Sequence, residues 1–136
     1  MLILVVEDET LVAFALKWVL ELAGHEVLGP ADKVEDAVEL CRTTSPDLAL
    51  IDLNLRDGGD GVEVARYLHH QRTPCLFVSA QAAHARAHRH LARGMVRKPY
   101  DCVCLPAIVD FVAGLDRKKQ PVQVPTGLEL YEPDER

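Results

Sequence analysis

The sequence predicts one α/β domain, in which a parallel sheet of five strands has helices on both faces in a doubly wound arrangement. Short apolar runs alternate with longer amphipathic stretches over about 115 residues, and such alternation favours parallel strands joined by right-handed crossovers. Most runs contain Leu, Ile and Val without intervening polar residues, which is typical of strands buried on both faces. The length of 136 residues suits a single core that folds without disulfides or a structural metal.

Each predicted strand is a short apolar run. The five runs are residues 2–6, 26–28, 48–51, 75–78 and, more weakly, 95–96. Helical patterns follow them over residues 11–22, 34–41, 62–68, 82–92 and 105–115. Gly24 supplies a stop for the first helix, and Asp32, Asp60 and Asp101 are placed to cap the second, third and fifth helices.

The last part of the chain lacks a sustained hydrophobic period. Residues 117–136 hold three of the eight prolines, so we expect a domain over residues 1–116 and a flexible tail over 117–136. Composition does not decide whether this tail docks on the domain or on a partner. Because no output domain follows residue 116, the sequence favours a stand-alone domain.

Composition excludes several classes of protein. No run approaches the roughly 18 uncharged apolar residues of a membrane span, and the N-terminus lacks the basic region and cleavage site of a signal peptide. We therefore expect a cytoplasmic protein with no membrane partner. The four cysteines show no CxxC spacing, so we expect reduced thiols.

The charge of -6 is unevenly distributed. Residues 1–63 carry fourteen acids and four bases, whereas residues 64–100 carry seven bases and no acid. A basic segment can indicate nucleic-acid binding, but aromatic interleaving and a base-reading motif are missing. We therefore expect no direct binding of nucleic acid, and a basic surface that faces a partner or solvent.

Two short patterns raise the possibility of a transition-metal site. Cys102 and Cys104 are two residues apart, and His84 and His88 are neighbours on one helical face. Neither pair has further closely spaced ligands that would complete a tetrahedral zinc site. We expect the histidines to lie on a solvated helix face.

Polar side chains occur where four of the predicted strands end. Glu7 and Asp8 follow the first strand, Asp52 the third, Ser79 the fourth and Lys98 the fifth. In open α/β sheets, ligands collect outside the carboxyl ends of the strands. The alternative is that each residue has only a local role, in a turn, at a helix start or in solvent, but chance poorly explains all five strand-end positions.

Such a cluster is suited to phosphate chemistry. Three carboxylates repel one another unless a cation lies among them, and oxygen ligands favour Mg²⁺. Lys98 adds a positive charge and Ser79 a hydroxyl, so metal, ammonium and hydroxyl could surround a phosphoryl group. A carboxylate beside the metal could then be the nucleophile.

At these positions the sequence resembles the receiver domain of two-component response regulators, over about residues 1–115. Four blocks carry the resemblance in order: ILVVEDE at residues 3–9, PDLALIDLNL at 46–55, PCLFVSA at 74–80 and VRKPYD at 96–101. The resemblance implies a flavodoxin-like fold with strand order 2-1-3-4-5. It also implies a cis Lys98–Pro99 bond.

The resemblance further implies roles for the clustered residues. Asp52 would accept a phosphoryl group from a phosphohistidine on a sensor histidine kinase or phosphotransferase. Asp8, Asp52 and the backbone carbonyl of Asn54 would hold Mg²⁺, and Glu7 would help through a coordinated water. Ser79 would contact the phosphoryl oxygens and Lys98 would pair with them. The domain would assist its own phosphorylation and dephosphorylation without being an enzyme.

Some positions differ from the common pattern of this family. Met95 stands where an aromatic switch residue is usual, and Arg56 replaces a frequent proline. The loop over residues 57–61 is one residue longer than is usual in the family. The interval from Ser79 to Lys98 is a few residues short, which indicates a short or mobile fourth helix. These changes resemble a variant class of receivers that is often single-domain.

The leading hypothesis is a phosphorylation switch, monomeric or weakly dimeric, that binds a downstream target through its fourth helix, fifth strand and fifth helix or acts as a phosphate sink. The rival is an interaction module of the same fold that works without phosphorylation, although such a module would not need Asp8, Asp52 and Lys98. A phosphatase with a catalytic aspartate is disfavoured, because such enzymes place a second acid two residues after the first, where this chain has Asn54.

Overall fold

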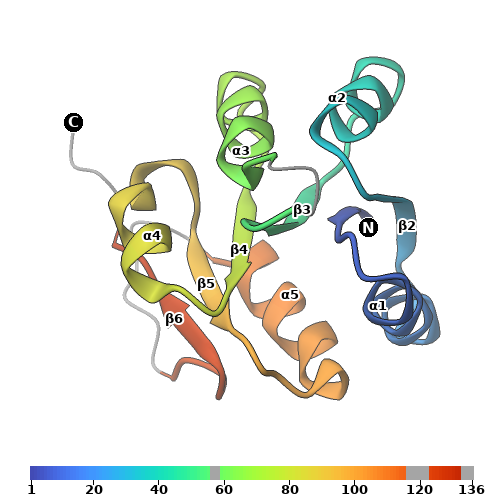
Figure 1. Ribbon diagram of the computed structural model, residues 1–136. Helices are drawn as coiled ribbons and strands as arrows, with labels where there is room; N and C mark the ends of the chain where they lie inside the picture. Colours follow the sequence, from blue (N-terminus) through green and yellow to red (C-terminus); the bar gives the residue numbers. More distant parts are fainter. Residues whose placement is uncertain (56–58, 116–122, 133–136) are drawn as a thin grey trace.

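The computed structural model describes residues 1–55, 59–115 and 123–132 and contains one six-stranded sheet (Figure 1). The strand order is β2-β1-β3-β4-β5-β6. The first five strands pair in parallel and β6 pairs with β5 in the antiparallel direction. The strands are β1 (Leu2–Val6), β2 (Glu26–Ala31), β3 (Leu48–Asp52), β4 (Cys75–Ser79), β5 (Gly94–Arg97) and β6 (Leu128–Leu130). The predicted order 2-1-3-4-5 is therefore confirmed, with one strand added.

Helices cover both faces of the sheet, as the sequence predicts. They are α1 (Thr10–Leu22), α2 (Val34–Thr43), α3 (Gly61–His70), α4 (Ala82–Ala87) and α5 (Leu105–Ala113), with 3₁₀ turns η1 (Arg89–Leu91) and η2 (Cys102–Cys104). The helices α1 and α5 lie on one face, and α2, α3 and α4 on the other. Each layer buries its own apolar core against the sheet.

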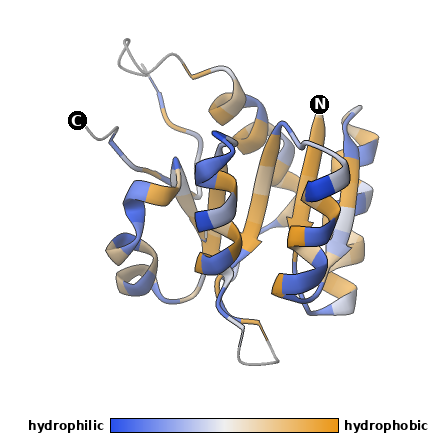
Figure 2. Ribbon diagram, turned by 90° about the horizontal axis from the view of Figure 1, so that it is seen from above, coloured by the Kyte–Doolittle hydropathy of each residue, from blue (hydrophilic) through white to orange (hydrophobic). Residues whose placement is uncertain are grey.

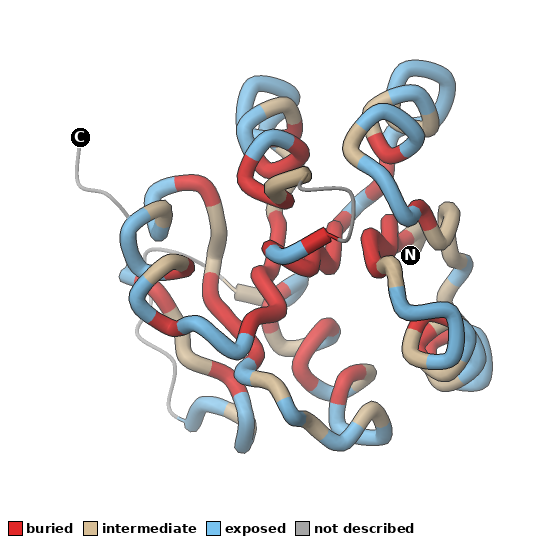
Figure 3. The backbone as a smooth tube through the Cα atoms, viewed as in Figure 1, coloured by how far each residue is buried: buried red, intermediate tan, exposed pale blue. Residues whose placement is uncertain are grey.

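The strands supply the centre of both cores. Alternate residues of β1 point to opposite faces, so that Ile3 and Val5 belong to the core beneath α1 and α5, whereas Leu4 and Val6 belong to the core beneath α2 and α3. Every residue of β3 and β4 is buried, and Figures 2 and 3 show the apolar, buried centre of the sheet. Because the strands are buried, the polar residues of the site occur where the strands end.

Two of the three predicted helix caps are present. The Asp60 carboxylate accepts a hydrogen bond from the Val62 amide at 2.9 Å, and Asp101 accepts one from the Val103 amide at 3.1 Å, ahead of η2 and α5. The prediction for Asp32 is wrong, because Lys33 is the residue before α2 and no side chain of the described residues caps that helix.

The fourth helix is shorter than the residue pattern predicts, in agreement with the short interval from Ser79 to Lys98. A single helix was expected over residues 82–92, but α4 ends at Ala87 and the chain continues as the 3₁₀ turn η1. The break follows from packing, since Leu91 turns inward to join the core while the Cys75 carbonyl accepts a hydrogen bond from the Arg93 amide at 2.8 Å.

The sixth strand corrects the prediction of a five-stranded sheet. It lies in the segment expected to be a flexible tail, of which residues 117–122 and 133–136 lie outside the described residues. Leu128 packs into the core beneath α5, and Tyr131 into the core beneath α4. Gly94 permits the pairing, because a Cβ there would approach the Glu129 carbonyl oxygen to 2.5 Å.

Candidate functional site

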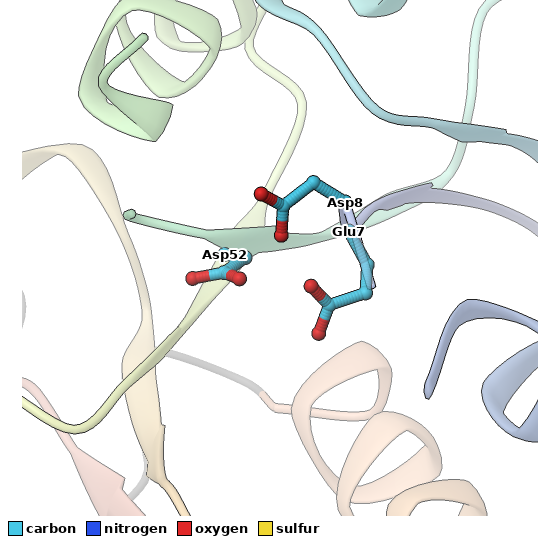
Figure 4. A group of neighbouring side chains, drawn as sticks. All are labelled: Glu7, Asp8 and Asp52. Atoms are coloured by element: carbon cyan, nitrogen blue, oxygen red, sulfur yellow. The ribbon is translucent and has the colours of Figure 1, made fainter. Parts of the chain in front are cut away.

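Three carboxylates converge at the carboxyl ends of the central strands. Glu7 and Asp8 follow β1, and Asp52 is the last residue of β3, which lies beside β1 in the sheet. One oxygen of each carboxylate lies within 4.8 Å of the others, and Figure 4 shows the three groups facing a common space. The neighbouring parallel strands place these residues together, as the sequence analysis predicts.

Asp52 is held in place by both of its oxygens. Its side chain is 5% exposed, Oδ1 accepts a hydrogen bond from the Asn54 amide at 3.0 Å, and Oδ2 accepts one from Lys98 Nζ at 2.9 Å. The close approach of α3 fixes this turn as well, because a Cβ at Gly61 would overlap the Asp52 carbonyl oxygen. The carboxylate of Asp52 is therefore oriented before any ligand arrives.

Lys98 bridges two buried acids. Its Nζ lies 2.9 Å from Asp52 Oδ2 and 3.3 Å from Glu7 Oε1. Burial alone would lower the pKa of Lys98, but the hydrogen bonds and negative charges of Asp52 and Glu7 outweigh burial and raise it. The ammonium therefore stays charged. The Lys98–Pro99 peptide is cis, as the resemblance implies.

Glu7 is the acid most affected by its surroundings. Burial, a hydrogen bond with Asp52 and repulsion from the Asp52 charge raise the pKa of Glu7 from 4.5 to about 7, against the opposing effect of Lys98. Three acids and one lysine leave an excess of negative charge that a divalent cation would neutralise. The donor set consists of carboxylate oxygens, and Asn54 also lines the pocket above them. Such oxygen ligands fit a hard ion such as Mg²⁺.

An open pocket of about 260 Å³ lies over this cluster. It reaches Asp8, Asp52 and Lys98 from solvent, whereas Glu7 and Ser79 are absent from its lining. Three of the lining residues, Glu9, Leu55 and Ala80, are not among those predicted from the sequence. Each lies close in sequence to a predicted site residue, and adjacency to a strand end was the signal that could have found them.

Ser79 lies at the predicted strand end but faces the following loop. It is fully buried, and its Oγ accepts a hydrogen bond from the Gln81 amide at 2.9 Å and donates one to the Gln81 carbonyl at 3.4 Å. Gln81 is the residue before α4. The hydroxyl therefore ties the end of β4 to the start of α4.

The structure shows the surroundings of Met95 and His84, two further residues that the sequence singled out. Met95, at the position of the usual switch residue, is buried and pairs with Glu129 of β6. His84 contacts Asp60 at 3.4 Å. Among the described residues, Glu7, Asp8 and Asp52 form the one group of three potential metal ligands. Arg56 and residues 57–58 of the loop lie outside the described residues.

The family model of the response regulator receiver domain matches residues 3–110. The chain belongs to this family. Among curated proteins, this receiver domain is similar to the sensory transduction protein LytT of Bacillus cereus, with 40% identity over 81 residues, which are 59% of this chain and 32% of LytT. It is also similar to the phyllosphere-induced regulator PhyR of Methylorubrum extorquens, with 35% identity over 80 residues, which are 57% of this chain and 30% of PhyR.

Solved structures of receivers share the fold. The non-phosphorylated receiver domain of HemR from Leptospira biflexa has a TM-score of 0.75 and 28% identity, over 90% of this chain and 98% of that one. The response regulator PhyR from Brucella abortus has a TM-score of 0.69 and 27% identity, over 79% of this chain and 45% of that one. The chain spans about a third of the length of the curated relatives named above.

Receiver domains are signalling domains of two-component systems. The resemblance to this family, which four sequence blocks carry, is confirmed. Within the part of the chain that the structure describes, no helix is long and apolar enough to cross a membrane.

Proposed function

We propose that Asp52 accepts a phosphoryl group from a phosphohistidine of a sensor kinase or phosphotransferase, and that this modification switches a partner-binding face. The observation that carries the proposal is the position of the Asp52 carboxylate. It lines an open pocket, 2.9 Å from the Lys98 ammonium and among two further acids. A nucleophile, a fixed cation and a place for a metal are the parts that phosphoryl transfer requires.

In the proposed transfer, an Asp52 oxygen attacks the phosphorus of the phosphohistidine. The new O–P bond replaces the N–P bond, and the imidazole leaves and takes up a proton, so that Asp52 becomes an acyl phosphate. Lys98 moves from the Asp52 carboxylate to a phosphoryl oxygen, where it stabilises negative charge. Its long side chain and partial exposure, 27%, permit this shift.

A magnesium ion, when bound, would neutralise charge on the transferring phosphoryl oxygens. Asp8, Asp52 and the Asn54 carbonyl are the residues that would hold it. Glu7 is almost fully buried and already contacts Lys98, which supports the indirect role, through a coordinated water, that the resemblance implies.

In the proposal, Ser79 couples the phosphoryl group to helix α4. To donate a hydrogen bond to a phosphoryl oxygen, its hydroxyl must leave the Gln81 backbone, to which it is bonded at 2.9 and 3.4 Å. Because Gln81 precedes α4, this exchange would alter the start of that helix and so the face that α4 belongs to. Downstream targets would then distinguish the two states of Asp52.

The partner face that we propose differs from the one expected from the sequence. The edge of β5 is covered by β6, which an Arg86–Glu129 ion pair ties to α4. A partner would therefore meet α4, β6 and α5, or displace β6 to reach β5.

The rival hypothesis is an interaction module that works without phosphorylation. It predicts the same partner affinity with and without beryllofluoride, a mimic of the phosphoryl group.

The test is phosphorylation of the full chain by a small phosphodonor with Mg²⁺. We expect one acid-stable, base-labile phosphate, lost when a chelator removes the metal and lost in Asp52→Asn. Asp32→Asn, an exposed acid outside the pocket, is the matched control and should be labelled like the wild type. No phosphate on the wild-type chain, or equal labelling of Asp52→Asn, would overturn the proposal.

A further inference from the structure

The outer face of α1 carries a concentration of exposed apolar side chains. Leu11, Phe14, Trp18 and Leu22 are 85%, 62%, 68% and 71% exposed. Val103 of η2, which packs beside α1, is 70% exposed. Of the six large apolar residues exposed in the described part of the chain, these five lie in one place, which we call the α1 patch. Figures 1 and 3 show α1 at the periphery of the molecule, with its outer turns exposed.

The patch lies opposite the face by which α1 joins the core. Ala13, Leu16 and Leu20 are buried against the sheet, and at 3.6 residues per turn the residues on the far side are those of the patch. A surface helix usually carries polar residues there. The whole of α1 has only three polar residues, Thr10, Lys17 and Glu21. A helix that is apolar on nearly all sides is normally covered on all sides.

The size of the patch matches the core of a stable interface. At about 150–250 Å² for a large side chain, five residues exposed to this degree offer about 600 Å². That area is at the upper limit of the patches found on typical monomers. It is also close to the apolar part of a standard interface, which buries about 800 Å² on each partner.

The order of the residues along α1 suits a second copy of the same chain. In a two-fold antiparallel pair of helices, the same surface must be complementary to itself. With the axis near the middle of α1, Leu11 of one copy meets Leu22 of the other, and Phe14 meets Trp18. Each large side chain thus faces another large apolar side chain, and the opposed helix dipoles attract each other.

We propose that two copies of this chain associate through the α1 patch, by antiparallel packing of their α1 helices about a two-fold axis. No residue of the patch lines the Asp52 pocket. The proposal is independent of phosphorylation and of magnesium.

The fluorescence of Trp18 can report this contact. Trp18 is the only tryptophan in the sequence and lies at the centre of the patch. Sedimentation of the full chain over a wide concentration range should show a monomer–dimer equilibrium. Trp18 emission should move to shorter wavelength over the same range, because the indole leaves water on association.

Substitutions at exposed positions separate association from folding. Phe14→Glu keeps Trp18 and should weaken the dimer about a hundredfold or more, because a carboxylate would be buried without a partner. Val124→Glu is the matched control. Val124 is an exposed apolar residue outside the patch, and its replacement should leave the dimer unchanged. Circular dichroism should show unchanged secondary structure for both variants.

A charge pair tests the antiparallel arrangement itself. The double variant Leu11→Glu/Leu22→Glu should be monomeric, because like charges would meet across the axis. Leu11→Glu/Leu22→Lys should regain the dimer, because each Glu then faces a Lys of the other copy. A wild-type chain that stays monomeric with Trp18 in water overturns the proposal and leaves the patch to a different protein. A dimer insensitive to Phe14→Glu, or no recovery by the Glu/Lys variant, also overturns it.

Discussion

Lys98 offsets the negative charge of the buried acids. Its ammonium compensates Asp52 and Glu7, whose side chains are 5% and 3% exposed. Buried carboxylates without a partner are strongly destabilising. The same group is placed to follow the negative charge when it moves onto a phosphoryl group. The sequence identified Lys98 by its place at a strand end, but its contact with Glu7 depends on side-chain directions that only the folded pocket defines.

The first prediction concerns removal of this charge. Lys98→Met should lower the free energy of unfolding by about 2 kcal/mol at pH 8 without metal, since two buried acids lose their partner. Urea denaturation measures the loss. Arg66→Met, on the exposed side of α3, is the matched control and should change stability by less than about 0.5 kcal/mol. Equal effects of the two substitutions would contradict the assigned role.

The second prediction concerns the pH dependence that Glu7 imposes. Because its pKa is raised from 4.5 to about 7 in the folded chain, the folded state binds more protons than the unfolded state between these values. Stability should therefore fall as pH rises from 4.5 to 7, by up to about 3 kcal/mol. Urea denaturation in a chelator at pH 5 and pH 8 measures the fall. Glu7→Gln should reduce it, and an unchanged pH dependence in that variant would refute the assignment.

Among the elements, the six strands show how far sequence pattern reaches. The buried strands β1, β3 and β4 are continuous apolar runs and could be predicted. β6 could not, because Leu-Glu-Leu at residues 128–130 is three residues long and becomes a strand only by pairing with β5. The break after α4 has a similar origin, since an Ala- and His-rich segment favours a longer helix and the inward turn of Leu91 overrides that preference.

The third prediction concerns the attachment of β6. Gly94→Ala should push this strand from β5, because the added Cβ would approach the Glu129 carbonyl oxygen to 2.5 Å. Hydrogen exchange at the Tyr131 amide, which donates to the Arg93 carbonyl at 2.9 Å, should become faster. Gly114→Ala is the control, since a Cβ there lies 3.4 Å or more from its neighbours. Unchanged protection of Tyr131 in Gly94→Ala would show that the pairing tolerates the methyl group.

For the whole molecule, the acidic cluster links stability to divalent cations. A ligand that binds the folded state alone stabilises the protein in proportion to the logarithm of its concentration. The sequence predicted where these acids converge. It did not show how Lys98 and Glu7 share their charges, because that depends on burial as well as on position.

The fourth prediction is that Mg²⁺ raises the melting temperature at pH 8 and does so less at pH 5. Protonated Glu7 relieves the same repulsion that the cation relieves, so the two effects should not add. Thermal denaturation with Mg²⁺ and with chelator measures the difference. Asp8→Asn should weaken the response, whereas Asp32→Asn should keep it. Equal stabilisation of both variants would place the cation elsewhere.

The pairing of β5 with β6 has a consequence for how the chain reaches its fold. It joins Gly94 to Leu130, so β5 is synthesised before the strand that covers its edge. Until then β5 is an open edge of unpaired amide and carbonyl groups, a template for pairing with another chain. Until β6 pairs with β5, the incomplete sheet is therefore more prone to aggregate than the complete one.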